Sequence, residues 1–138
     1  MEMTVNAINW FEIPVIDFAR AKKFYNAILD FDMPEMQMGP AQMGFLPHEQ
    51  GKGIGGAIIK VDGHVPSTMG TLVYLSCGND LSVVLGRVEA AGGKVLAPKT
   101  LIAEGMGYFA HFLDIEGNRV GLHSMNRQPE NRSSFSMK

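Results

Sequence analysis

The sequence predicts an α+β domain built from two βαβββ repeats. A strand-like stretch, an amphipathic helix and three further strand-like stretches follow one another within residues 5–62, and the same order returns within residues 71–125, about sixty residues later. Each repeat is too short to bury much core alone, so we expect both to form one domain over residues 1–125. The polar, aperiodic segment 126–138 is predicted to be a flexible C-terminal tail.

The first repeat opens with the strand-like stretch AINWFEIP. Side chains alternate between the two faces of a strand, so Phe11 and Ile13 share one face, while Trp10 and Glu12 share the other. Asp17 is a predicted helix N-cap, because its carboxylate can accept hydrogen bonds from the free N–H groups of the next turn.

The helix after Asp17 carries its apolar side chains on one stripe, which we expect to face the core: Phe18, Ala21, Phe24, Tyr25, Ile28 and Leu29. Its opposite face carries charged side chains that we expect to be solvated: Arg20, Lys22 and Lys23. Three β-prone stretches follow at 31–38, 42–47 and 53–62, separated by turns rich in glycine and proline.

The second repeat follows a short linker at 63–70. Its first strand is TLVYLSC, and Asn79 or Asp80 can cap the helix after it. The apolar residues of this helix fall on one face: Leu81, Val84, Leu85, Val88 and Ala91. A pair of glycines ends the helix, and three strand-like stretches complete the repeat: KVLAPK, GYFAHFLD and RVGLHSM, the last two joined by the tight turn IEGN.

Composition excludes several classes of partner. A net charge of −2 gives no electrostatic reason to expect nucleic acid or an anionic membrane surface. No apolar run approaches the ~20 residues that a membrane span needs. Cys77 is the single cysteine, so no intrachain disulfide can form and we predict a cytoplasmic protein. We expect Cys77 to be a small buried apolar residue and not a catalytic thiol.

Three stretches of the chain resemble the vicinal oxygen chelate superfamily, which includes glyoxalase I, dioxygenases and bleomycin-binding proteins. They are PVIDFARAKKFYNAILDF in the first repeat, and DLSVVLGRVEAAGGKVLAPK and GYFAHFLDIEGNRVGLHS in the second. The resemblance implies a half-open, eight-stranded glyoxalase-like barrel whose concave face lines a cleft for a small-molecule ligand. Many members dimerise, so we predict a homodimer.

Metal-dependent members of that superfamily hold one divalent ion with side chains of the first and last strands of each unit. Alignment to the resemblance puts these ligand positions on residues that cannot coordinate well: Trp10, the stretch Gly55, Gly56 and Ala57, Val73 (or Thr71), and Gly121. We therefore predict no metal cofactor. A divalent metal would need a non-standard set, with Glu12 and His123 joined by His48 or His111.

The small residues at these positions leave space on the cleft floor, which suits an organic ligand. We predict Glu12 as a general base and His123 as its acid or electrostatic partner. Five residues are predicted to contact the ligand: Trp10, Tyr74, Tyr108, His111 and Gly121. The other two histidines, His48 and His64, are expected to be solvated.

Two functions remain open from the sequence. One is a glyoxalase-like enzyme, a lyase or isomerase acting on a small oxygenated molecule without the usual metal ligands. The other is a non-catalytic protein that sequesters a drug or metabolite, as the bleomycin-resistance type does. A structural or regulatory partner domain has the least support, since only the polar tail favours it.

Overall fold

The computed structural model describes residues 3–125. The first module contains β1 (Phe11–Pro14), α1 (Phe18–Leu29), β2 (Glu35–Met38), β3 (Ala41–Phe45) and β4 (Gly56–Lys60). The second module contains β5 (Tyr74–Ser76), α2 (Ser82–Leu85), β6 (Lys94–Ala103), β7 (Gly107–Leu113) and β8 (Arg119–Ser124). This order confirms the predicted α+β class with two βαβββ units. The tail predicted at 126–138 lies outside the described residues.

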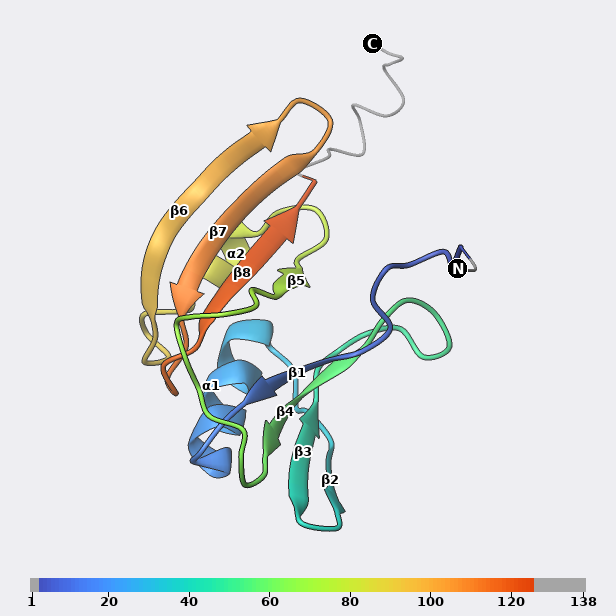
Figure 1. The fold of residues 1–138 in the computed structure, drawn as a ribbon. Helices are drawn as coiled ribbons and strands as arrows, with labels where there is room; N and C mark the ends of the chain where they lie inside the picture. Colours follow the sequence, from blue (N-terminus) through green and yellow to red (C-terminus); the bar gives the residue numbers. More distant parts are fainter. Residues whose placement is uncertain (1–2, 126–138) are drawn as a thin grey trace.

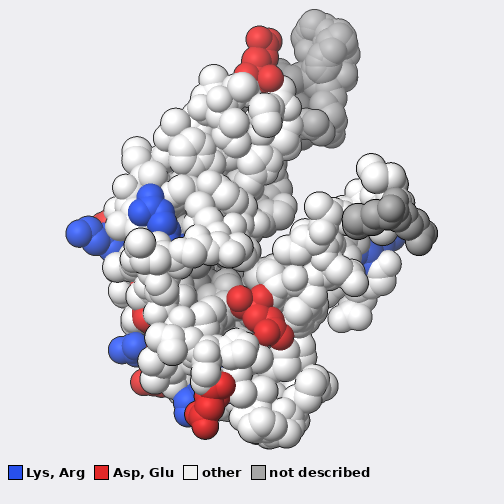
Figure 2. Space-filling view, in the orientation of Figure 1, with Lys and Arg blue, Asp and Glu red and all other residues white. Residues whose placement is uncertain are grey.

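Each module forms one four-stranded sheet, with strand order β1-β4-β3-β2 in the first and β5-β8-β7-β6 in the second. The pairs β1–β4 and β5–β8 are parallel and the other neighbours are antiparallel. Among the described residues the two sheets share no strand pairing, so together they form the predicted half-open barrel (Figure 1). The surface is hollowed between them, on a face with few charged side chains (Figure 2).

A single core joins the two modules through α1. The buried stripe of this helix is the predicted one and includes Phe24, Tyr25 and Ile28. The ring of Phe24 packs against Phe112 of β7, with centroids 6.0 Å apart, and Leu122 of β8 is buried in the same cluster. Because α1 packs on strands of both modules, neither sheet has a complete core of its own. Within the described chain, neither helix has the length and apolar content that crossing a membrane requires.

The second helix is shorter than the sequence predicts. It spans only Ser82–Leu85 and ends at Gly86. The next N–H groups, of Arg87 and Val88, each bond to a carbonyl three residues back, which is the tighter winding of a 3₁₀ turn. Glycine is a poor helix former, so the α-helix stops there although the apolar face continues. The packing part of the prediction is confirmed, since Leu81 and Val88 are fully buried.

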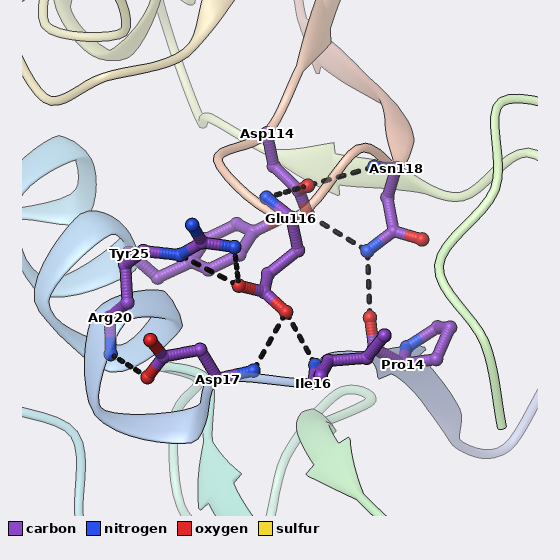
Figure 3. Close-up of polar contacts among 8 residues, drawn as sticks. All are labelled: Pro14, Ile16, Asp17, Arg20, Tyr25, Asp114, Glu116 and Asn118. Atoms are coloured by element: carbon purple, nitrogen blue, oxygen red, sulfur yellow. Dashed lines mark hydrogen bonds and ion pairs between the residues drawn. The ribbon is translucent and has the colours of Figure 1, made fainter.

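The turn between β7 and β8 fastens the second module to the first (Figure 3). Oδ1 of Asp114 accepts hydrogen bonds from the backbone N–H groups of Glu116 and Asn118 at 2.9 and 2.8 Å. Oδ2 accepts from the Tyr25 hydroxyl of α1 at 2.7 Å and from Nδ2 of Asn118 at 3.0 Å. Nδ2 of Asn118 also donates to the carbonyl of Pro14 in β1 at 2.7 Å. Both α1 and β1 are therefore tied to this turn.

Glu116, in the same turn, binds the N-terminal end of α1 (Figure 3). Its Oε1 accepts from the backbone N–H groups of Ile16 and Asp17, and its Oε2 pairs with the guanidinium of Arg20. Arg20 is exposed, as predicted for this face of the helix, but the prediction did not include its ion pair with the other module, where the side chain of Glu116 is only 1% exposed. Burial acts to raise the pKa of Glu116, but the two N–H groups and Arg20 outweigh it, so this pKa lies below its ordinary value of 4.5.

Replacing Glu116 with glutamine should lower the free energy of unfolding by about 1 to 3 kcal/mol at neutral pH, because the side chain that accepts from Ile16, Asp17 and Arg20 loses its charge. The folded pKa of Glu116 is the lower one, so the carboxylate stabilises the fold fully above pH 4.5 and this contribution is lost as the pH falls through the folded value. Urea unfolding of both proteins over a series of pH values should show their stabilities converging in acid.

The matched control is Glu35→Gln, because Glu35 pairs with Lys22 at 2.6 Å but its side chain is 47% exposed. An exposed ion pair contributes at most about 1 kcal/mol. A loss at Glu116 no larger than the loss at Glu35, or one that persists unchanged in acid, contradicts the role given to this carboxylate.

Candidate functional site

The second module presents a row of polar side chains on the open face of its sheet. Strand register places Gly121 of β8 between Tyr74 of β5 and His111 of β7. Arg119 and His123 lie two residues before and after Gly121, so strand alternation puts them on the same face. Their neighbours in sequence point the other way, into the shared core.

Tyr74, His111 and Arg119 form a hydrogen-bonded chain on this face. The hydroxyl of Tyr74 lies 2.8 Å from Nε2 of His111, and Nε and Nη2 of Arg119 lie 3.1 and 2.9 Å from Nδ1. A guanidinium can only donate, so Nδ1 is the acceptor and Nε2 carries the proton of the neutral imidazole. Burial, with the charge of Arg119, lowers the pKa of His111 below 6.5 and so keeps the ring neutral at neutral pH.

Tyr74, His111 and Gly121 are among the predicted ligand contacts, and the structure brings these three together. Arg119 is not among the predicted site residues. The signal was present, because Arg119, Gly121 and His123 are spaced by two and must share a face of the last strand.

Gly121 and Gly56 lie directly beneath aromatic rings. A Cβ atom added at Gly121 would lie 2.4 Å from Cδ2 of Tyr74, and one added at Gly56 would lie 2.3 Å from Cε1 of Phe11. Side-chain carbons do not approach so closely, so these rings can lie where they do only because both residues are glycine. Gly121 is a position where the resemblance implies a metal ligand. Gly56 lies within the stretch implied for another ligand, but it pairs with Phe11 and so faces away from Trp10 and Glu12.

The residues at the expected metal positions do not fit a divalent metal. Such a metal needs three or four imidazole, carboxylate or thiolate groups that converge on one point. Over residues 3–125, no three His, Cys, Asp or Glu side chains lie close enough together to hold an ion. Cys77 is half-buried, and burial raises the pKa of its thiol to about 11, so the thiol is protonated at neutral pH.

A cavity of about 740 Å³ opens between the two modules. It is bordered by the arm before β1, by the segment 46–56 and by β5, and the rings of Phe11 and Tyr74 both face it. His48, expected to be solvated, is exposed but also borders this cavity. A groove of similar volume, about 730 Å³, lies along the outer side of α1 and is lined largely by charged side chains: Lys22, Lys23, Asp32, Glu35 and Lys60. The inner cavity is the more apolar of the two and is the candidate ligand site.

A smaller cavity of about 110 Å³ adjoins the first, since Thr71 and Val73 border both. Glu12 and Arg119 line this smaller cavity. The hydrogen-bonded chain that begins at Arg119 therefore runs from the smaller cavity to Tyr74, which borders the larger one.

Glu12 and Trp10 lie on the open face of the first sheet. The indole N–H of Trp10 donates to Oε2 of Glu12 at 3.3 Å, and its ring meets Phe45 edge-on at 6.2 Å between centroids. Glu12 is exposed, so water can solvate its charge.

Two other predicted site residues, His123 and Tyr108, also lie outside the hydrogen-bonded series of Tyr74, His111 and Arg119. His123 contacts the carbonyl of Met106 through Nε2 at 2.8 Å, and it lies four residues beyond Arg119, or about 13 Å along β8. Within residues 3–125, His123 and Glu12 share no hydrogen bond or ion pair. Tyr108 lies on the opposite face of β7, packed on the core, with the ammonium of Lys99 4.8 Å from its ring centroid.

Comparison with known proteins places these features in a family. Residues 7–122 match the family model described as the Glyoxalase/Bleomycin resistance protein/Dioxygenase superfamily. No curated protein sequence matches the chain significantly.

Solved structures share the fold at low sequence identity. A glyoxylase/bleomycin resistance protein/dioxygenase domain from Frankia sp. EAN1pec is 18% identical with a TM-score of 0.64, over 93% of this chain and 97% of that one. The antibiotic-binding protein TnmS3 from Streptomyces sp. CB03234 is 22% identical with a TM-score of 0.60, over 90% and 99%. The fosfomycin resistance protein FosX from Listeria monocytogenes is 15% identical with a TM-score of 0.59, over 94% and 99%. At these identities the likeness establishes the fold alone.

Replacing Gly121 with alanine should displace the Tyr74 ring, because the added Cβ would come within 2.4 Å of it. The rings of Tyr74 and His111 have centroids 5.4 Å apart, so NMR cross-peaks between them should be present in the wild type and lost in the variant. Gly86→Ala is the control, because its φ of −66° suits alanine. Ring cross-peaks that survive in Gly121→Ala would contradict the steric argument.

Proposed function

Because the chain belongs to the Glyoxalase/Bleomycin resistance protein/Dioxygenase superfamily, we propose that it binds a small organic molecule between its two modules without a metal. One observation carries the proposal. The ring of Tyr74 covers Gly121, where a metal ligand would be expected, and Tyr74 and Phe11 both border the inner cavity. A concave site with aromatic walls and few polar groups is the usual form of a small-molecule site.

Sequestration of the ligand is the role that we favour. TnmS3, which shares the fold, is described as an antibiotic-binding protein, and this supports binding without turnover as a role for such a cavity. The residues predicted as a catalytic pair also have different partners, Trp10 for Glu12 and the carbonyl of Met106 for His123, which weakens the case for acid–base chemistry between them.

A lyase or isomerase is the second candidate, and one observation favours it. The carboxylate of Glu12 borders the smaller cavity together with Arg119, next to the chain that ends at Tyr74. A carboxylate that shares a cavity with an arginine is suited to act as a general base on a substrate that the arginine polarises.

Compounds found by thermal-shift screening should bind with an affinity that Tyr74→Ala lowers about tenfold or more, because a buried aromatic contact is worth roughly 1.5 to 3 kcal/mol. Isothermal titration calorimetry measures this loss, and added chelator should leave the wild-type affinity unchanged. Tyr108→Ala is the control, since it removes the same ring from the opposite face of the sheet.

Two results would count against this proposal. Equal losses in the two tyrosine variants would mean that the cavity is not the site, and a loss of binding with chelator would mean that a metal is required.

Mass spectrometry of the recovered compound separates the two functions. An unchanged compound supports sequestration, whereas conversion that stops in Glu12→Gln with binding retained identifies an enzyme.

We also propose a homodimer. Exposed apolar side chains on the open face of the first sheet support it, because Trp10, Met36 and Met38 are 41%, 49% and 55% exposed. They lie beside a buried apolar cluster on that face: Met43, Ala57 and Ile59. Contiguous exposed apolar surface of this kind is typical of an interaction site.

Sedimentation velocity should therefore give twice the mass of one chain for the wild type. Combining Met36→Glu with Met38→Glu should yield the monomer, because two charges would be buried in the contact. Met106→Glu, on an exposed turn of the second module, should leave the dimer intact. A monomeric wild type at all concentrations would refute this assembly.

A further inference from the structure

We infer that the inner cavity selects ligands that present an acceptor oxygen, a carbonyl or a carboxylate, to the hydroxyl of Tyr74. This inference rests on the proposed binding function and names the ligand class for the same cavity. It follows from which atom carries the proton in each hydrogen bond of the series Arg119, His111 and Tyr74.

Each link of this chain has a fixed direction. The guanidinium of Arg119 donates to Nδ1 of His111, so the one proton of the neutral ring is on Nε2. That Nε2–H donates to the oxygen of Tyr74 at 2.8 Å. The hydroxyl proton of Tyr74 is therefore not used in the chain, and within residues 3–125 this hydroxyl has no second hydrogen-bond partner.

Tyr74 also borders the space in which we propose that the ligand binds. The residue is 47% exposed and borders the inner cavity, and its ring is held against Gly121. A hydroxyl whose oxygen already accepts one hydrogen bond presents its proton to the remaining side, so it offers the ligand a donor.

The positive charge of Arg119, at the start of this hydrogen-bonded series, strengthens the preference for an acceptor oxygen. Hydrogen bonds in series polarise one another, so the positive Arg119 strengthens each donor down to Tyr74. The charged side chains that border the cavity, Glu49 and Lys52, pair with each other at 3.6 Å and largely offset one another. An electron-rich oxygen is stabilised at the end of such a chain, whereas an ammonium group would meet only a donor there.

The test uses naphthalene compounds that differ only in the head group. Acetylnaphthalene carries a carbonyl and ethylnaphthalene is its counterpart without oxygen, while naphthoate and naphthylmethylammonium supply the two charges. Wild-type protein should bind the carbonyl and the carboxylate about tenfold more tightly than ethylnaphthalene, the effect of one well-placed hydrogen bond. Tyr74→Phe should abolish this preference, so that the carbonyl and carboxylate compounds bind no more tightly than ethylnaphthalene.

Arg119 is a positioning residue in this scheme, and its test is spectroscopic. Nitrogen NMR of the His111 ring should report the Nε2–H tautomer in the wild type and a mixture of tautomers in Arg119→Met, with the preference for acetylnaphthalene reduced. A wild-type Nδ1–H tautomer would reverse the chain and overturn the inference.

The outcomes separate the two claims. If the naphthalenes bind without head-group preference, if the ammonium binds best, or if Tyr74→Phe keeps the preference, then the inference is wrong and the proposed binding function stands. If none of the four compounds binds, ethylnaphthalene included, the proposed function fails with it.

Discussion

The carboxylate of Asp114 is the interaction on which the arrangement of the two modules depends. It is 3% exposed and accepts four hydrogen bonds, which is how the cost of burying a charged group is offset. Three of the four donors belong to its own turn and the fourth is Tyr25 of the other module. Since no strand pairing joins the two sheets within residues 3–125, this turn and the core around α1 set the gap between β1 and β5. The inner cavity is in that gap.

The geometry of the site depends on the lack of a side chain at Gly121 as much as on the side chains that are present. Removing the Cβ at Gly121 lets the Tyr74 ring lie flat against β8, and this places its hydroxyl within reach of His111. Arg119, two residues before Gly121 in β8, then fixes the tautomer of His111. A glycine, an aromatic ring and a basic group on neighbouring strands thus produce a directional donor, with no cofactor needed to orient it.

Much of the fold could be predicted from the sequence because the local signals agreed. The apolar stripe of α1, the N-cap at Asp17 and strand alternation in β8 each specify burial over short distances, and the structure has them as expected. Contacts between distant residues could not be predicted in this way. Arg20 looked solvated because its partner Glu116 lies 96 residues away in the chain. For the same reason the period-two pattern put His123 on the correct face but not its distance from Glu12, which depends on how the sheets are placed.

The position of the Tyr74 ring against Gly121 also limits how mutation can convert this protein into a metal-dependent relative. A coordinating side chain introduced at Gly121 would collide with the ring, and removing the ring alone would leave a hole in the cavity wall without supplying a ligand. A ligand at position 121 is therefore compatible only with loss of the ring, so the two positions are coupled. Relatives that bind a metal at this position are expected to lack the tyrosine, whereas relatives with the tyrosine are expected to have the glycine.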